Sequence, residues 1–97
     1  MKKALLLTAD DTVATALQAI SAGEDVEIVL HGETAGQVRA TQDIPYGFKI
    51  CARAMAKGAS VIKYSHPIGR AREDIAAGDL VHVHNIEGNR GRGDLAQ

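Results

Sequence analysis

The chain has 97 residues, of which 45% are hydrophobic, and its 11 basic and 12 acidic residues leave a net charge of −1 at pH 7. This length predicts one small domain with a single core, and the balanced charge argues against nucleic acid or a membrane as a main partner. Because only 3% of the residues are aromatic, we expect an aliphatic core. Cys51 is the only cysteine, which excludes an internal disulfide and is typical of a reducing compartment. We interpret it as a small core residue rather than a nucleophile.

The N-terminal stretch MKKALLL, residues 1–7, imitates the start of a signal peptide. Its apolar run stops at Thr8-Ala9-Asp10-Asp11, well short of a full signal core or a membrane span. We therefore expect a cytoplasmic protein.

Residues 11–20 have two interpretations. With Asp10 or Asp11 as the N-cap, apolar residues at helical spacing indicate a short helix, namely Val13, Ala16, Leu17 and Ile20. Ala14 and Ala16 also alternate with polar residues, which indicates a strand over residues 13–17. Both interpretations stay open.

Three segments share one template, in which an apolar residue is followed by two residues, a glycine, two residues and a valine. They are ISAGEDV (residues 20–26), MAKGASV (55–61) and IAAGDLV (75–81). The apolar residue can anchor a turn on the core, glycine adopts a positive φ without steric cost, and the β-branched valine favours a strand. We therefore expect each copy to be a turn that opens a strand.

Short strands are predicted over residues 26–30, 36–39, 48–52, 61–64 and 80–84. Turns are predicted at Ile44-Pro45-Tyr46-Gly47 and at His66-Pro67-Ile68-Gly69, where proline fixes φ and glycine supplies conformational freedom. The pattern predicts a compact, mainly β domain over residues 1–88 with at most one short helix. Residues 89–97 have no apolar periodicity and are expected to form a flexible C-terminal tail.

His82 and His84 alternate with Val81 and Val83, so in a strand the two imidazoles share one face. Two imidazoles could hold a divalent metal, but a complete coordination shell needs further ligands that this segment does not supply. The plainer interpretation is a solvated strand face, which on the residues alone is favoured. His31 and His66 lie at predicted turns and could complete a cluster only if the fold brings those turns together.

Arg90 and Arg92 are spaced by glycines and could clamp a carboxylate, sulfonate or phosphate, although a polar, flexible tail explains them equally well. Lys49, Lys63 and Tyr64 lie in predicted strands, where lysine is most often an exposed residue that protects an edge.

An ordered set of segments covers nearly the whole chain: IPYGFKI (44–50), MAKG (55–58), VIKY (61–64), PIGRA (67–71) and IAAGDLVHVHN (75–85). This set resembles the SAF domain of the altronate and galactarate dehydratases, both as an N-terminal domain and as the small subunit of two-chain relatives. The resemblance implies a β-clip fold, in which short strands fold over twice. It also implies a role beside a large catalytic chain that removes water from a sugar acid, assisted by a divalent metal, often iron.

The resemblance also implies roles for particular residues. His82, His84 and Lys49 match its motifs and would be catalytic, with the two histidines also as metal ligands. The substrate-binding set would be Asn85 and Tyr64, to which the anion clamp of Arg90 and Arg92 would add.

Two residues depart from the family pattern. Phe48 stands where the family commonly has histidine, and Ser65 stands where glycine commonly follows the tyrosine. His66 is a speculative substitute for the histidine at position 48.

Because the chain ends soon after Asp94, we expect a stand-alone small subunit that binds the large chain, with a homo-oligomer left open. The two-chain relatives include sulfolactate sulfo-lyase, so the alternative is the alpha subunit of an enzyme that expels sulfite from a similar hydroxy acid. A further alternative is a SAF module without chemistry that binds a sugar acid or stabilises its partner.

Overall fold

The computed structural model of the protein describes residues 1–88. They form nine strands and no helix: β1 (Lys2–Leu6), β2 (Val13–Ala16), β3 (Asp25–Leu30), β4 (Glu33–Arg39), β5 (Lys49–Cys51), β6 (Ser60–Lys63), β7 (His66–Ala71), β8 (Leu80–Val81) and β9 (Ile86–Gly88). Among these residues there is accordingly no helix able to cross a membrane. The mainly β prediction is confirmed, and the arrangement is consistent with a SAF-like β-clip.

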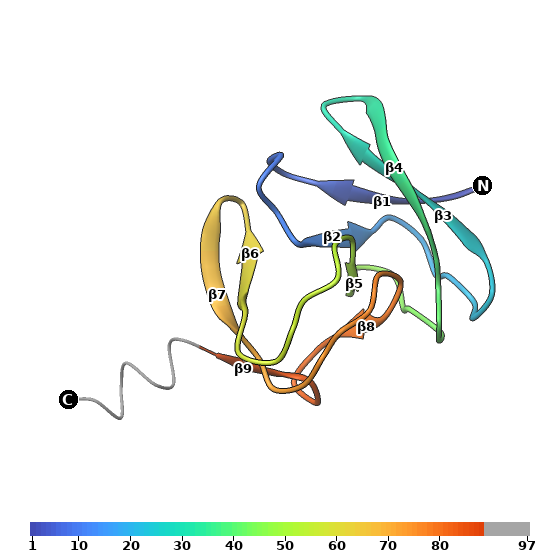
Figure 1. Ribbon diagram of the computed structural model, residues 1–97. Coiled ribbons are helices and arrows are strands. Elements are labelled where there is room, and N and C mark those ends of the chain that lie inside the picture. The colour runs from blue at the N-terminus through green and yellow to red at the C-terminus, as the bar shows by residue number, and fades with distance from the viewer. Residues whose placement is uncertain (89–97) are drawn as a thin grey trace.

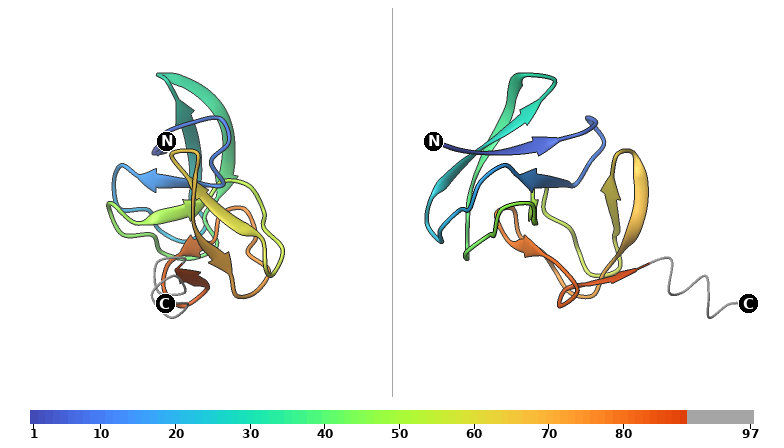
Figure 2. Two further views of the ribbon diagram at one scale, coloured as in Figure 1. Left: turned by 90° about the vertical axis from the view of Figure 1, so that its left-hand side faces the viewer. Right: turned by 180° about the vertical axis from the view of Figure 1, so that it is seen from behind.

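The strands form two sheets. The larger has six strands in the order β4-β3-β1-β2-β5-β8, and the smaller has three in the order β6-β7-β9. Figures 1 and 2 show the β3–β4 and β6–β7 hairpins on opposite sides of the molecule, with β2 and β5 between them. All of the paired strands are antiparallel except β1 and β3, which run parallel.

Two hydrophobic clusters fill this arrangement, rather than the single core expected from the length. The first packs β1 to β4 around Ile20, Ile44 and Ile50, and the second lies beneath the smaller sheet around Met55, Val61 and Ile75. Both clusters are aliphatic, as the composition predicts. Cys51 is fully buried in the second cluster, which agrees with its interpretation as a core residue.

Strands β2 and β5 contribute to both clusters. Side chains alternate along a strand, so Val13 and Cys51 point into the second cluster whereas Ala14 and Ile50 point into the first. Val13 pairs with Cys51 and Ala14 pairs with Ile50 across the ladder, which keeps the two faces in register.

The glycine turns predicted from the repeat are confirmed, with φ of 87° at Gly23, 88° at Gly58 and 98° at Gly78. A fourth turn of the same kind occurs at Ile44-Pro45-Tyr46-Gly47, where φ of Gly47 is 82°. This turn does not match the repeat template in sequence, because isoleucine rather than valine stands three residues after the glycine.

The four turns associate in pairs. Ile20 and Ile44 form an isolated antiparallel bridge, in which each backbone N–H donates to the carbonyl of the other residue, with N···O distances of 2.9 and 2.8 Å. Met55 and Ile75 form the same kind of bridge, with both N···O distances at 2.8 Å. In each pair, the glycine N–H of one turn also donates to a backbone carbonyl of the other turn. The acceptor is always a small buried residue that lies four positions before the apolar anchor of its own turn. The four bonds are Gly23 to Ala40, Gly47 to Ala16, Gly58 to Ala71 and Gly78 to Cys51. The sequence repeat thus corresponds to two paired-turn units, one for each cluster.

The structure corrects three expectations about individual elements. Residues 13–16 form strand β2, so the helix interpretation of residues 11–20 is wrong and the strand interpretation is confirmed. The predicted turn at residues 66–69 lies within strand β7. The predicted strand over residues 80–84 ends at Val81.

Candidate functional site

A turn over residues 82–85 carries both candidate histidines. The backbone N–H of His82 donates to Oδ1 of Asn85 at 2.9 Å, and Nδ2 of Asn85 donates to the Leu80 carbonyl at 2.7 Å. The backbone N–H groups of Asn85 and Ile86 both donate to the His82 carbonyl at 3.1 Å. Asn85 is only 3% exposed, so its amide holds the turn from inside. His82 and His84 therefore lie in a turn, and not on one face of a strand as the sequence predicted.

The turn presents its other residues to solvent. His82, Val83 and His84 are all exposed, with Val83 at 70%. The His82 ring lies against Phe48, with a centroid distance of 4.9 Å and an interplanar angle of 42°. Phe48 therefore contacts His82 and covers one face of its imidazole.

Lys49 is the first residue of β5, and its side chain points to the opposite face from that of Phe48, the residue before it. It pairs in register with Thr15 and Val81, and Val81 is buried in the second cluster, whereas Phe48 packs on the first. Burial lowers the pKa of the half-buried Lys49 ammonium, and the nearby charge of Lys63 lowers it further. The two lysines form a positively charged position next to the second cluster.

Tyr64 and Ser65 form the tip of the β6–β7 hairpin, with φ of 55° and 63°. This left-handed conformation is unfavourable for residues other than glycine, so a glycine would fit position 65 without strain. The Tyr64 side chain is 62% exposed, and its ring meets the His66 ring edge-on at a centroid distance of 6.3 Å. His66 therefore lies beside Tyr64 and not at the position that Phe48 occupies.

Asp11 anchors this strained tip. Its fully buried carboxylate accepts hydrogen bonds from the backbone N–H of Ser65 at 3.0 Å, from the N–H groups of Leu7 and Thr8 at 3.1 Å, and from the Thr8 hydroxyl at 2.7 Å. Burial alone would raise the pKa of Asp11, but these donors and the Tyr64 backbone lower it to about 2.

Asp11 was expected only as a candidate helix cap, so this anchor was not predicted. The useful signal is a threonine three residues before an aspartate, a spacing at which the two side chains bond locally in a turn. Its contact with Ser65 lies 54 residues away and has no local signature.

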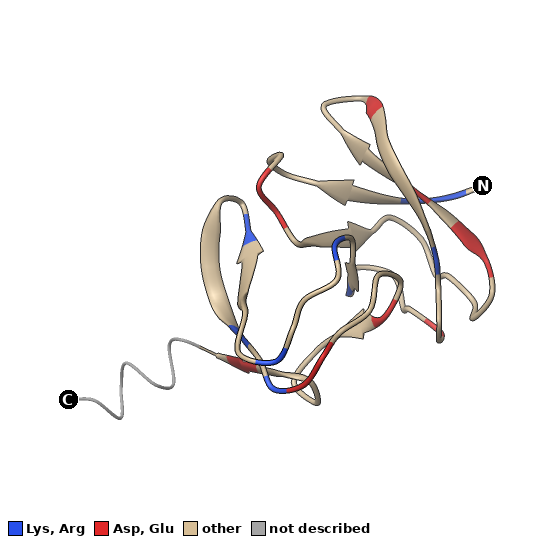
Figure 3. Ribbon diagram, in the orientation of Figure 1, with Lys and Arg blue, Asp and Glu red and all other residues tan. Residues whose placement is uncertain are grey.

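The structure brings together His82, His84, Asn85 and Phe48, and places Lys49 near Lys63 on a separate face. His31 and His66 lie at different hairpins and do not join the turn. Within residues 1–88, no three His, Cys, Asp or Glu side chains are grouped so that they could hold a metal ion. Figure 3 shows the acidic and basic residues interspersed over the strands. Arg90 and Arg92, together with the tail predicted over residues 89–97, lie outside the described residues.

These features can be compared with known proteins. The family model for the altronate/galactarate dehydratase SAF domain matches residues 2–89. The chain belongs to this family. The resemblance drawn from the ordered motifs is thereby confirmed.

The curated relatives are of two kinds. The chain is 44% identical over 79 residues to altronate dehydratase from Escherichia coli and 35% identical over 89 residues to altronate dehydratase from Bacillus subtilis. These matches cover 81% and 92% of this SAF family chain but only 15% and 17% of the two relatives. A further match, 36% identical over 84 residues, covers 84% of the chain and 89% of the (2R)-sulfolactate sulfo-lyase subunit alpha from Chromohalobacter salexigens.

Proposed function

We propose that the protein is the small, non-autonomous subunit of a carbon–oxygen lyase that acts on a sugar acid. In this proposal, the turn over residues 82–85 lends His82 and His84 to a site completed by a large catalytic chain. The observation that carries the proposal is the turn itself: a buried Asn85 holds the backbone of a turn that carries two exposed imidazoles, within a domain of the dehydratase SAF family. An exposed turn fixed from inside is suited to meeting a partner surface.

The chemistry of dehydration gives the histidines a specific task. A base removes the proton beside the substrate carboxylate, and the hydroxyl on the next carbon must leave with its bonding electrons. Hydroxide is a poor leaving group, so it has to be protonated as its bond to carbon breaks. Imidazole donates protons near neutral pH, and we assign this donation to His82, which the Phe48 ring orients, or to His84 in the same turn.

A divalent metal such as Fe2+ would supply Lewis-acid stabilisation of negative charge beside the carboxylate. Whichever of His82 and His84 does not donate the proton could provide one of its ligands, and residues 1–88 offer no three-ligand group. The remaining ligands would have to come from the large chain. Lys49, on the other face of β5, and Lys63 on β6 are proposed to attract the anionic substrate or an acidic surface of that chain.

A second candidate is the alpha subunit of a sulfolactate sulfo-lyase-like enzyme. It is favoured by the match of 36% identity that covers 89% of such a subunit. Sulfite leaves as a stable anion and needs no proton from the enzyme. The two candidates therefore differ in how strongly turnover depends on a histidine proton donor.

The test is reconstitution with a large dehydratase chain from the same genome. Altronate, galactarate and (2R)-sulfolactate are each supplied with Fe2+, and keto-acid formation and sulfite release are measured. The proposal expects no turnover from this chain alone and dehydration by the mixture. The double variant H82A/H84A should lower kcat for dehydration by about 100-fold or more, the usual contribution of a positioned general acid. The matched control His31→Asn removes an exposed histidine from a distant hairpin and should leave kcat unchanged.

Three outcomes would contradict the proposal. Sulfite release with no dehydration would favour the sulfo-lyase candidate. Saturable sugar-acid binding by the isolated chain, without any role in turnover, would favour a binding module. Full activity of H82A/H84A, with only thermal stabilisation of the large chain, would leave a structural cap.

A further inference from the structure

A groove opens beside the β3–β4 hairpin, at the margin of the first hydrophobic cluster. It has a volume of about 180 Å³, and its aliphatic walls include Leu6, Ile28, Leu30 and Val38. Leu6 and Ile28 are buried members of the cluster, whereas Leu30 and Val38 are half-buried and pack against it. The groove therefore leads from the surface to the edge of the core.

The missing side chain of Gly36 leaves part of this space open. Gly36 pairs with Ile28 across β4 and β3, and residues that face each other in a strand pair point to the same side of the sheet. A Cβ at Gly36 would therefore point to the side of the buried Ile28, and it would meet no neighbouring atom within 4 Å. Both residues line the groove, so a larger side chain at position 36 is expected to enter it.

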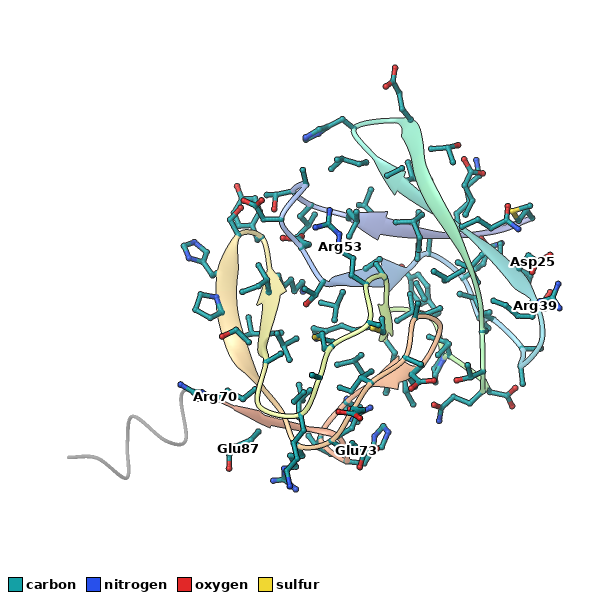
Figure 4. All side chains as sticks on the ribbon, in the orientation of Figure 1. Asp25, Arg39, Arg53, Arg70, Glu73 and Glu87 are labelled. Carbon is teal, nitrogen blue, oxygen red and sulfur yellow. The ribbon has the colours of Figure 1, made fainter. Side chains whose placement is uncertain are left out.

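A single cation lies at the rim of this groove. Of the residues among 1–88 that line it, only Arg53 is charged. The Nη2 of this exposed arginine donates to the carbonyl of Ala9, another lining residue, and this contact orients the guanidinium. Among the described residues Arg53 forms no ion pair, and Figure 4 shows the labelled residues Asp25, Glu73 and Glu87 well away from it. A guanidinium has five N–H donors, so others remain for an acceptor that enters the groove.

These features together select a class of ligand. Aliphatic walls favour a hydrocarbon chain, because burial of apolar surface drives association. One unpaired guanidinium favours one carboxylate, which it can bind through two parallel hydrogen bonds. A cavity of about 150 Å³ holds the six carbons of benzene, so a groove of about 180 Å³ is suited to a chain of roughly five to seven carbons. A polyhydroxylated sugar acid is unsuited to it, since its hydroxyl groups would lose hydrogen bonds to water against aliphatic walls.

We propose that this groove is a binding site for a short aliphatic monocarboxylate, with the hydrocarbon chain against Leu6, Ile28 and Val38 and the carboxylate on Arg53. The proposal is independent of the lyase function, because none of the candidate site residues lines the groove. The Kd for a six-carbon carboxylate, hexanoate, should be on the order of 1 mM, since Arg53 is exposed and only a few methylene groups are buried.

The test is an NMR titration of the 97-residue chain with butanoate, pentanoate, hexanoate and octanoate, followed through the backbone amide signals. With hexanoate, the amides of Gly36, Val38 and Arg53 should shift and saturate, while those of the turn over residues 82–85 should not move. Each methylene that the groove buries should lower the Kd by about threefold to fourfold. This gain should stop once the chain exceeds the length of the groove, since further carbons stay in water.

Two ligand controls separate the charge from the chain. Hexylammonium has the same chain with the opposite charge, and should bind at least about tenfold more weakly than hexanoate because it is repelled by Arg53. Acetate has the carboxylate without the chain, and should produce no saturable shift at these residues.

Two variants test the two parts of the site, each with a matched control. Arg53→Gln should raise the Kd for hexanoate by about threefold or more, whereas Arg72→Gln removes the same charge from an exposed loop and should leave the Kd unchanged. Gly36→Leu should fill the groove and raise the Kd at least about tenfold, because several methylene groups lose their burial. Gly36 has no positive φ, so leucine introduces no backbone strain there. Ser60→Leu adds the same side chain at an exposed position of the other sheet and should bind hexanoate like the unchanged chain.

Circular dichroism of each variant confirms that its strands are intact before binding is compared. A chain whose amide signals show no saturable shift with hexanoate up to about 20 mM, well above a millimolar Kd, would overturn the proposal. So would hexylammonium that binds as tightly as hexanoate, or a Gly36→Leu variant that binds hexanoate as the unchanged chain does.

Discussion

The buried carboxylate of Asp11 accepts a hydrogen bond from the backbone N–H of Ser65, 54 residues further along the chain. The loop between β1 and β2 is thereby fastened to the tip of the β6–β7 hairpin, which belongs to the other sheet. Asp11→Ala should lower the free energy of unfolding by about 1–3 kcal/mol, because it leaves buried N–H donors without an acceptor. Urea unfolding measures the loss, and Asp10→Ala, at the exposed neighbouring position, is the control. Equal effects of the two substitutions would contradict the assigned role.

The same carboxylate gives a pH dependence with a definite sign. The pKa of Asp11 is about 2 in the folded chain and 3.8 in the absence of its partners, so the folded state holds the ionised form more strongly than the unfolded state does. The stabilisation from Asp11 is complete above about pH 5 and is lost as the pH falls from about 4 through 2. The stability curves of the original chain and of Asp11→Ala should therefore converge in acid. A constant difference down to pH 2 would show that Asp11 does not titrate as inferred.

Substitutions of Asn85 distinguish a structural role for this residue from a role in contacting substrate. Its amide satisfies the His82 N–H and the Leu80 carbonyl, so Asn85→Ala should destabilise the isolated domain by about 1–3 kcal/mol. Asn85→Asp keeps the acceptor for the His82 N–H and loses the donor to the Leu80 carbonyl. Its stability should therefore lie between those of the original chain and of Asn85→Ala. If Asn85 only contacted substrate, thermal unfolding without any ligand would not distinguish these variants.

Cys51 should be chemically silent in the folded protein. Burial, with the nearby Asp79 charge, raises the pKa of its thiol to about 11, and its Sγ donates to the Arg53 carbonyl at 3.0 Å. Iodoacetamide at pH 8 should leave folded Cys51 unmodified and label it fully in urea, as mass spectrometry can show. Ala54→Cys supplies an exposed thiol for comparison and should react in the folded state.

Three glycines differ in what a side chain at their position would meet: steric overlap, backbone strain or neither. At Gly78, φ is 98° and a methyl group would overlap the Arg39 carbonyl, so Gly78→Ala should cost more than about 3 kcal/mol. At Gly23, φ is 87° but the space is open, so Gly23→Ala should cost about 1–2 kcal/mol from backbone strain alone. Gly36→Ala has neither problem and should be neutral or slightly stabilising. Any other ranking in thermal unfolding would contradict this account.

The turns of this fold could be predicted from sequence because their cause is local. A glycine with positive φ between an apolar anchor and a β-branched residue needs no distant partner, and Gly23, Gly58 and Gly78 behave as expected. The pairing of the turns was not predictable, since the bridges of Ile20 to Ile44 and of Met55 to Ile75 depend on how the chain folds back.

The failed predictions also have physical causes. β2 lies in the interior of the sheet and is buried on both faces, so its apolar residues do not alternate and imitate a helical pattern. β7 contains Pro67, which favoured a turn over a strand. At the candidate site, the alternation of His82 and His84 with valines predicted a strand. A turn forms instead because the side chain of Asn85 hydrogen-bonds the His82 N–H and the Leu80 carbonyl, in place of a neighbouring strand.

Adjacent residues of β2 and β5 face different hydrophobic clusters, and this has a consequence for how the protein unfolds. Neither cluster can open without withdrawing strands that the other also needs, so the two should melt together in a single cooperative transition. The amide protons of β2 and β5 should then exchange with solvent only through global unfolding, whereas those at the tips of the two hairpins can exchange through local opening. The rigid part of the molecule is in this sense its middle layer, from which both hairpins and the histidine turn project.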